Sequence, residues 1–371
     1  MSKIHYHFDH VGSYLRPQAL KDAREQFAQG KISHEDLLAI QDKLVAELVH
    51  HQVDNGLKVV SDGEFGRSWW HLDFLWELTG FEAYLQEDSY KFHGAKTRTT
   101  NVRLNGKVAE NPDHPFYRDF QYLQSIVPEG VTPKVTIPSP SLVIKRDHRS
   151  DLYADYYENW SDFLDGLAKA YHDTIQHFYD LGARYVQLDD TTWAYLIQQL
   201  ETYHDQPEKR AEFEQIAEDD VYVINKALEG LPEDLTVATH ICRGNFKSTY
   251  LFEGSYQTVA KYLGQLNYDI FFLEYDDERS GDFSPIVDIW NGRENVELVL
   301  GVVTSKDPQL EDIDAVVARI EEAAKLIPLK NIGISTQCGF ASTEEGNILT
   351  EEDEWKKLQL IKTITDKVWG N

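Results

Sequence analysis

The chain has 371 residues, of which 42% are hydrophobic, so it is long enough to bury a large core. It has 36 Lys and Arg against 63 Asp and Glu, and this net charge of −27 argues against nucleic acid and anionic membrane partners, which need a basic face. It contains no apolar run of about 18 residues and no signal-like apolar segment near residue 1, so we expect a cytoplasmic protein without membrane spans.

Short apolar runs alternate with amphipathic segments along the chain, a pattern typical of βα units around a parallel sheet. The predicted strands cover residues 8–14, 58–64, 134–137, 185–190, 235–242, 269–274, 296–303 and 332–335. The predicted helices cover residues 18–29, 33–55, 116–126, 153–179, 193–200, 212–228, 256–266, 313–327 and 351–368. Eight strands predict an α/β fold of the (β/α)8 TIM-barrel type that uses residues 1–371 as a single domain. An open doubly wound sheet is the alternative, but the first strand is not followed by a Gly-x-Gly-x-x-Gly fingerprint.

One long segment interrupts the alternation after the second predicted strand. It runs from Phe65 to about Phe116 and is rich in aromatic residues and alternating polar residues. We interpret it as an insertion, with a β-hairpin that turns at Asn105-Gly106.

Polar side chains follow almost every predicted strand. In a TIM barrel the active site lies at the carboxyl ends of the strands, so these side chains would share one mouth, and the pattern favours an enzyme. They are His10, Ser13, Asp62, Glu64, Asp189, Asp190, His240, Cys242, Glu274, Lys306 and Cys338.

Four of these residues predict a metal site. His240 and Cys242 are two positions apart on a strand and therefore face the same side, although a core cysteine beside a hydrogen-bonded histidine is the alternative. With Glu274 and Cys338 they form a set of two thiolates, one imidazole and one carboxylate that suits Zn²⁺ better than Mg²⁺ or Ca²⁺. The alternative for Glu274 is an exposed acid, because three further acids follow it closely. These are the two cysteines of the chain, so no disulfide framework is expected.

The segments His240-x-Cys242, Glu274 and Gln337-Cys338-Gly339 resemble the zinc ligands of cobalamin-independent methionine synthase in chain order and strand placement. The resemblance spans about residues 8–365 and matches the catalytic C-terminal half of the long enzymes, as in the short single-barrel paralogues. It also includes His10-Val11-Gly12-Ser13, Asp62-Gly63-Glu64-Phe65-Gly66-Arg67 and Val186-Gln187-Leu188-Asp189.

The resemblance implies a zinc-dependent methyltransferase that moves a methyl group to the zinc-bound thiol of homocysteine to give methionine. The donor it implies is 5-methyltetrahydrofolate, mono- or polyglutamyl. Glu64 and Asp189 would bind the substrate ammonium and Ser13 its carboxylate. The alternative for Asp189 is a helix N-cap before Thr191. The expected partners are these small molecules, and a homo-oligomer is compatible with the sequence.

Two family features differ in this chain. A histidine that follows strand seven in the family is replaced by Thr304-Ser305-Lys306-Asp307-Pro308, so Lys306 is the candidate acid or cation. The folate-stacking tryptophan after strand three has no counterpart between Ile137 and Leu142. Candidates for the stacking role are Trp69, Trp70 and Trp193, and candidates for mouth cations are Arg16, Arg67 and Arg243.

Other activities remain open at this point. A related zinc alkyltransferase could use a corrinoid or S-methyl donor, or another thiol such as coenzyme M, which has no ammonium for Glu64 and Asp189 to bind. A zinc hydrolase would need histidine-rich ligands and a general base, and the cysteines disfavour it. A non-catalytic zinc-binding protein is the fourth possibility.

Overall fold

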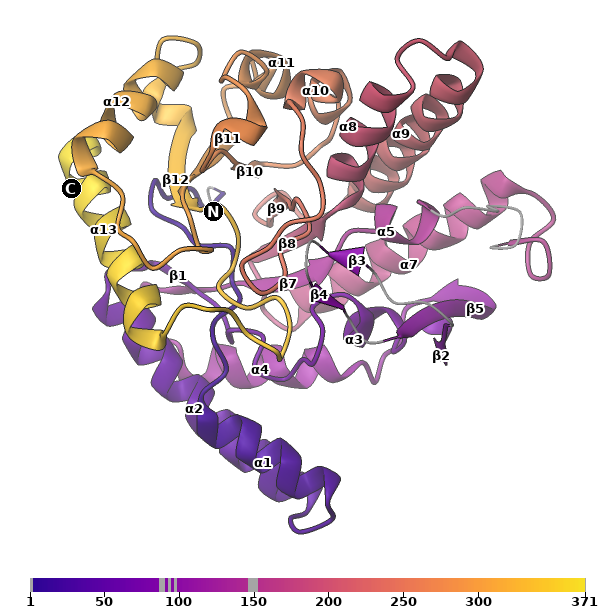
Figure 1. Ribbon diagram of the computed structural model, residues 1–371. Helices are drawn as coiled ribbons and strands as arrows, with labels where there is room; N and C mark the ends of the chain where they lie inside the picture. The colour runs from indigo at the N-terminus through magenta and orange to yellow at the C-terminus, as the bar shows by residue number, and fades with distance from the viewer. Residues whose placement is uncertain (1–2, 87–90, 93–94, 97–98, 146–152, 371) are drawn as a thin grey trace.

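The computed structural model describes residues 3–86, 91–92, 95–96, 99–145 and 153–370. Its central feature is a six-stranded parallel sheet in which the strands occur in the order of the chain (Figure 1). Every residue of these strands is buried, as expected of parallel strands covered by helices. The strands are β7 (Val135–Pro138), β8 (Tyr185–Asp190), β9 (Thr236–Ile241), β10 (Ile270–Glu274), β11 (Glu297–Val303) and β12 (Ile332–Thr336).

The first two predicted strands differ most from expectation. The second is reduced to β1 (Val59–Val60), which pairs in parallel with β6 (Thr132–Pro133), just before β7. The first, predicted over 8–14, is not a strand, and isolated parallel bridges join Phe8 to Ile334 and Ser13 to Gly63. The described residues therefore form an α/β fold with parallel sheets rather than eight complete strands.

Side chains explain why residues 8–14 do not form a regular ladder. The Lys134 ammonium donates to the His10 carbonyl, and the Ser61 hydroxyl donates to the Gly12 carbonyl. Gly12 itself has φ +130°, a conformation that only glycine adopts readily. The backbone groups that would pair along a strand are thus satisfied by neighbouring side chains.

The predicted hairpin turn at Asn105-Gly106 is wrong. These residues lie inside β5 (Thr100–Ala109), which pairs antiparallel with β2 (Thr79–Leu85). The register shifts where Asn105 and Gly106 occur, because Thr79 pairs with Ala109 and Phe81 with Leu104. The Asn-Gly pair therefore forms an irregularity of the β-bulge kind within a strand instead of a turn. The remaining elements of this segment are α3 (Leu72–Leu75), β3 (Lys91–Phe92) and β4 (Ala95–Lys96).

Helices surround the central strands in Figure 1. Four predicted helices differ by more than two residues at one end or more. The long helix begins at Trp160 instead of 153, because Asn159 accepts a capping hydrogen bond from the Asp162 amide. The helix predicted over 212–228 begins at Pro207, the helix predicted over 313–327 ends at Ala323, and 256–266 contains only short turns. The α-helices are α1 (Gln18–Ala28), α2 (His34–Asp54), α4 (Pro115–Ile126), α5 (Ser141–Ile144), α7 (Trp160–Asp180), α8 (Thr192–Thr202), α9 (Pro207–Leu228), α10 (Ala260–Leu263), α11 (Ile286–Trp290), α12 (Ile313–Ala323) and α13 (Glu351–Trp369). Short 3₁₀ helices are η1 (Tyr256–Thr258), η2 (Glu278–Ser280) and η3 (Leu329–Asn331).

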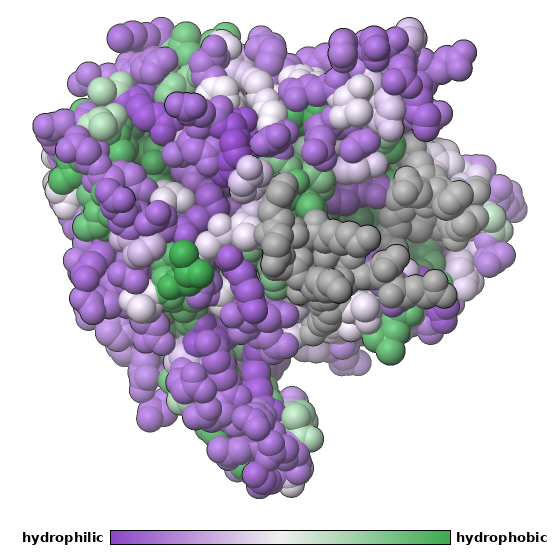
Figure 2. Space-filling model, viewed as in Figure 1, coloured by the Kyte–Doolittle hydropathy of each residue, from purple (hydrophilic) through white to green (hydrophobic). Residues whose placement is uncertain are grey.

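The surface agrees with the acidic composition. The face drawn in Figure 2 is mostly hydrophilic, with apolar side chains in small separate groups. Within the described ranges, no helix is both long enough and apolar enough to cross a membrane.

Candidate metal centre

The four predicted metal ligands lie together at the carboxyl ends of three strands. His240 belongs to β9, Cys242 directly follows β9, Glu274 is the last residue of β10, and Cys338 follows β12 after Gln337. All four side chains are buried, and their ligand atoms lie within 4.8 Å of one another. The parallel register makes this possible, because adjacent parallel strands end at the same edge of the sheet.

The spacing of the ligand atoms suits a tetrahedral zinc ion. The Sγ atoms of Cys242 and Cys338 are 3.9 Å apart. Zn–S bonds of ~2.3 Å at a tetrahedral angle put two sulfurs ~3.8 Å apart, whereas a disulfide requires ~2 Å. Glu274 Oε2 is buried without a hydrogen-bond partner, an arrangement that a metal ion would satisfy.

Burial also prepares the ligands for a cation. It lowers the pKa of His240 to about 4, so the imidazole is neutral at pH 7, the form that binds metals. It raises the pKa of Glu274 to about 7, and a bound cation would favour the ionised carboxylate. His240 Nε2 lies 3.0 Å from the Gln337 carbonyl oxygen, and Nδ1 lies 3.7 Å from Asp189 Oδ1. A metal ion on one ring nitrogen would leave the other nitrogen to its oxygen neighbour, which would fix the orientation of the ring.

A small pocket of about 300 Å³ opens beside this cluster. Three of the four ligands line it, together with all three residues predicted to bind the substrate amino acid: Ser13, Glu64 and Asp189. The remaining lining residues are Val11, Trp70, Gly339 and Ser342.

The two acids of the small pocket are held in place by neighbouring side chains. Glu64 has φ +61° and accepts a hydrogen bond from Thr136 at 3.0 Å, while its Oε2 atom is buried without a partner. Asp189 accepts a 2.7 Å hydrogen bond from the Gln187 amide. Burial, together with the charge of Glu64, raises the pKa of Asp189 well above its usual range. A positively charged group between these acids would give Glu64 Oε2 a partner and would lower the pKa of Asp189.

The alternative interpretation of Asp189 as a helix cap is resolved by its neighbour. Asp190 Oδ1 accepts the amide hydrogen of Thr192 at 2.7 Å, and Asp190 Oδ2 accepts from the Ser141 hydroxyl. Asp189 points instead to the pocket and His240.

Ser13 and Gly339 are packed without spare room. A Cβ atom on Gly339 would lie 1.9 Å from Ser13 Oγ, and the Phe340 amide donates to the Ser13 carbonyl. The segment that carries Ser13 is therefore fitted against the loop that carries Cys338.

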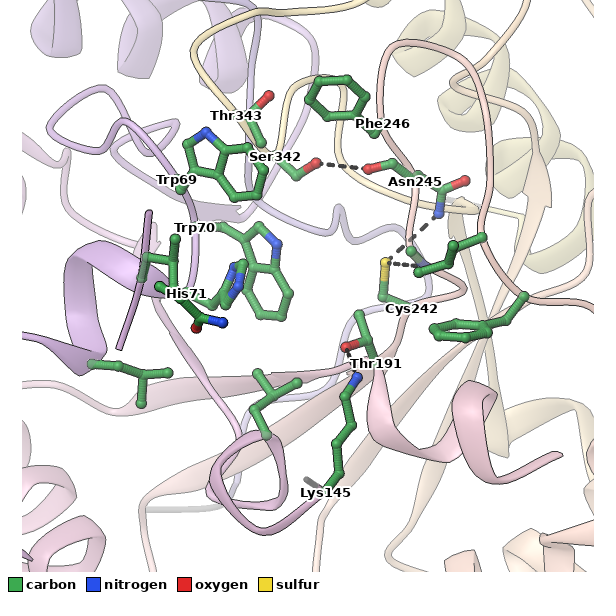
Figure 3. A pocket seen from close by; sticks show the side chains of 17 residues that line it. Trp69, Trp70, His71, Lys145, Thr191, Cys242, Asn245, Phe246, Ser342 and Thr343 are labelled. Carbon is green, nitrogen blue, oxygen red and sulfur yellow. Dashed lines mark hydrogen bonds between the residues drawn. The ribbon is translucent and has the colours of Figure 1, made fainter. Parts of the chain in front are cut away.

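A second pocket, of about 850 Å³, adjoins the small one (Figure 3). In Figure 3, Trp69, Trp70 and His71 lie across it from Cys242 and Thr191. Trp70, Cys242 and Ser342 line both pockets, so the two spaces meet at these residues. The other lining residues are Leu72, Leu75, Asn101, Leu142, Lys145, Gly244, Asn245, Phe246, Leu251, Phe252 and Thr343.

Several predicted positions lie outside the pockets. Trp193 is completely buried and stacks near Tyr262, so it forms part of the core and not an aromatic platform. Lys306 follows β11 and pairs with Asp276 instead of lining either pocket. Its charge acts on the metal cluster from a distance, because it lowers the pKa of Glu274 against the effect of burial.

The expected mouth cations are wrong. Arg16, Arg67 and Arg243 are all buried, and none of them lines the two pockets. Arg16 donates to backbone carbonyls, including that of Glu64, and Arg67 donates to the Thr136 carbonyl. The Arg243 guanidinium lies over the ring of Tyr256, 4.8 Å from its centre. Arg67 also forms an ion pair with Glu64, 3.5 Å from Nη1 to Oε1, so its charge lies beside one of the pocket acids without lining the pocket.

Asn245 was not predicted from the sequence. Its side-chain amide donates to Glu274 Oε1 at 2.7 Å and to Cys242 Sγ at 3.7 Å, and it also lines the large pocket. An asparagine three residues after a ligand carries no recognisable signal, since the loop conformation decides where the amide points.

One family model and several known proteins are similar to this chain. Residues 9–351 match the family described as cobalamin-independent synthase, catalytic domain. The chain is 43% identical to the uncharacterized protein YxjG of Bacillus subtilis over 97% of this chain and 94% of that one. It is 24% identical to a methionine synthase of Saccharolobus islandicus over 89% and 86% of the two chains. It is also similar to a solved Listeria monocytogenes structure, provisionally named a vitamin-B12-independent methionine synthase, with TM-score 0.78, 34% identity and full coverage of both chains.

Proposed function

Because the chain belongs to the cobalamin-independent methionine synthase family, we propose that it transfers a methyl group to the thiol of homocysteine to give methionine. The observation that carries this proposal is the composition of the small pocket. It combines three of the four candidate metal ligands with two acids and a serine, within about 300 Å³. This is the set of groups needed to hold a thiol, an ammonium and a carboxylate of one amino acid.

Zinc is the metal proposed for the cluster of His240, Cys242, Glu274 and Cys338. When bound, Zn²⁺ would keep a substrate thiol deprotonated at neutral pH, where a free thiol with a pKa near ~8.5 is mostly protonated. A reducing cytoplasm suits this use, because both cysteines are free and must stay unoxidised.

The chain's own residues would orient homocysteine. Glu64 and Asp189 are proposed to bind its ammonium, which would pair with the buried Glu64 Oε2 atom and favour the ionised form of Asp189. Ser13, which lines the same pocket, is proposed to bind its carboxylate. Held at both charged groups, the substrate can present only its side chain to the metal cluster.

The methyl donor is proposed to bind in the large pocket. Its aromatic lining residues, which include Trp69, Trp70 and Phe252, suit a flat ring. These features support 5-methyltetrahydrofolate, mono- or polyglutamyl. Lys145 is the one lysine or arginine among the described lining residues, and we assign it to a carboxylate of the donor.

Two structural expectations belong to the same proposal. We infer that residues 1–371 form one catalytic domain, and that the parallel sheets close into a TIM barrel. The bridges from Phe8 to Ile334 and from Ser13 to Gly63, with the pairing of β1 and β6, support closure between β12 and β7.

Lys306 is proposed as a positioning residue. Its ion pair with Asp276 keeps a positive charge near Glu274 without contact to either pocket. Lys306→Arg should retain activity and Lys306→Met should lose it, and the pH profile of kcat/KM in both variants tests the charge. Equal profiles in the wild type and in Lys306→Met would contradict this role.

The alternative is a zinc alkyltransferase of the same superfamily that uses a corrinoid or S-methyl donor, or another thiol such as coenzyme M. The two acids of the small pocket favour homocysteine, because coenzyme M has no ammonium. The test is to assay methionine by mass spectrometry after incubation with homocysteine and one of four donors. The donors are monoglutamyl and polyglutamyl methyltetrahydrofolate, methylcobalamin and S-methylmethionine. Zinc-loaded protein that forms no methionine with any of them would overturn the proposal.

A further inference from the structure

The side-chain amide of Asn245 contacts two candidate metal ligands at once. Its Nδ2 atom lies 2.7 Å from Glu274 Oε1 and 3.7 Å from Cys242 Sγ, and Figure 3 shows it above the sulfur. The Ser342 hydroxyl donates to the Asn245 backbone carbonyl at 3.1 Å, which anchors the residue to the loop after β12. Asn245 also lines the large pocket, as Cys242 does.

The hydrogen bonds make the two carboxylate oxygens of Glu274 unequal. Oε1 accepts from the Arg243 backbone amide at 2.9 Å as well as from Asn245. Oε2 has no partner among the described residues. Two N–H donors on one oxygen restrict rotation of the carboxylate and leave Oε2 available as a ligand atom.

The two cysteine sulfurs also differ in their hydrogen-bond donors. Cys242 Sγ accepts from the Gly244 backbone amide at 3.3 Å and from the Asn245 amide. In the described part of the chain, the hydrogen-bond partner of Cys338 Sγ is the other sulfur, 3.9 Å away. N–H donors withdraw electron density from a metal-bound thiolate, and hydrogen bonding around the cysteine sulfur is known to tune metal sites.

We propose that Asn245 is a positioning residue that holds Glu274 and lowers the nucleophilicity of Cys242, so that the methyl group goes to the substrate thiol and not to the protein. This rests on the proposed zinc-dependent function. Cys242 lines both pockets, at the point where a donor would meet the substrate. Methylation there would form a C–S bond at Sγ, release the donor with the bonding electron pair, and convert a thiolate ligand into a thioether.

The experiment compares two variants with the wild type as zinc-loaded proteins. Asn245→Leu keeps the number and branching of the side-chain heavy atoms and removes the amide, and Asn245→Asp removes the N–H donors and adds a charge. Ser248→Ala is the matched control, because Ser248 lies on the same loop, bonds to Asn347 and lines neither pocket. Iodoacetamide is the alkylating probe, with peptide mass spectrometry to separate Cys242 from Cys338, and a chromogenic chelator reports zinc release.

Both Asn245 variants should alkylate Cys242 at least tenfold faster relative to Cys338, and should release zinc about 10- to 100-fold faster. Ser248→Ala should match the wild type in both measurements. Unchanged Cys242 alkylation and zinc release in folded Asn245→Leu and Asn245→Asp would overturn the role of Asn245. Wild-type protein without zinc would instead overturn the proposed function, so the two failures are distinguishable.

Discussion

The Sγ atoms of Cys242 and Cys338 lie 3.9 Å apart, although 96 positions separate these residues in the chain. The spacing matches two thiolates on one tetrahedral zinc ion. Both sulfurs are buried and line the small pocket beside Glu64 and Asp189. This relationship brings the candidate metal cluster next to the two acids that are proposed to hold a positively charged group.

Loss of either thiolate should remove the metal. Cys242→Ser and Cys338→Ser each replace a thiolate with a hydroxyl that zinc binds poorly, so purified variants should contain well under one zinc per chain. Elemental analysis after purification, with circular dichroism as the control for folding, provides the measurement. One full equivalent of zinc in both folded variants would rule out the site.

The two acids should recognise the substrate ammonium. Glu64→Gln and Asp189→Asn each remove one charge while keeping the oxygen that accepts from Thr136 or Gln187. Homocysteine affinity should fall about 10- to 100-fold, the usual effect of losing a charged hydrogen bond.

The control ligand for these variants is 4-mercaptobutyrate, which is homocysteine without its amino group. Its affinity, measured by calorimetry, should be similar in wild type and variants. An equal loss of affinity for both ligands would mean that the acids support the fold of the pocket and do not contact an ammonium.

Gly339→Ala should displace the loop that carries Cys338. The new Cβ atom would lie 1.9 Å from Ser13 Oγ, so one of the two segments must move. We expect about 1–3 kcal/mol of destabilisation by urea unfolding, with weaker zinc retention. Gly106→Ala is the control, because its nearest neighbour would be Gly80 Cα at 3.7 Å. Similar stability and zinc content in both variants would show that the contact is not restrictive.

The large pocket should bind the donor through its aromatic wall. Phe252 lines this pocket but not the small one, so Phe252→Ala should weaken donor affinity roughly tenfold and leave homocysteine affinity unchanged. Fluorescence titration with monoglutamyl methyltetrahydrofolate measures donor affinity, and calorimetry measures homocysteine affinity.

Trp193→Phe serves as the comparison for the pocket variant. Trp193 is buried in the core, so this variant should lower the melting temperature and leave donor affinity unchanged. A loss of donor affinity in Trp193→Phe but not in Phe252→Ala would place the donor elsewhere.

His114 should make the fold sensitive to acid. Its Nδ1 accepts from the Phe116 amide at the start of α4 and its Nε2 donates to the Phe74 carbonyl, so the neutral ring is required. Burial lowers its pKa from 6.5 to about 4. The unfolded chain therefore binds a proton more readily than the folded chain does. The part of the free energy of unfolding that depends on the neutral His114 ring is fully present above pH 6.5 and is lost as the pH falls towards 4.

Protonation of His114 should lower the free energy of unfolding by about 3 kcal/mol in total, or ~1.4 kcal/mol per pH unit between these two pH values. Urea unfolding at about pH 7, 5.5 and 4.5 measures it, with His114→Asn as the control that keeps a capping acceptor without a titrating ring. If the two proteins lose stability in parallel with falling pH, His114 is not the source.

The strands of the main sheet were predictable because their local pattern is strong. β8 has the predicted bounds, and β9 to β12 lie within about one residue of them, since each is a nearly continuous apolar run that ends in polar residues. The common orientation of His240 and Cys242 was predictable for the same reason, because their two-residue spacing needs only an extended backbone. The turn prediction at Asn105-Gly106 failed because a local motif cannot reveal that β2 pairs with residues of β5 on both sides of it.

Local sequence patterns are sufficient to predict which side chains reach the carboxyl ends of the strands, because the two-residue repeat of a strand is a local property. They do not predict that Cys242 meets Cys338, that Asp189 and not Asp190 enters the pocket, or that three arginines are buried away from the pockets. These outcomes depend on strand order, register and loop conformation, which arise from contacts between distant residues. The position of the Asn245 amide is of this kind, since the loop after β9 directs it onto Glu274 and Cys242.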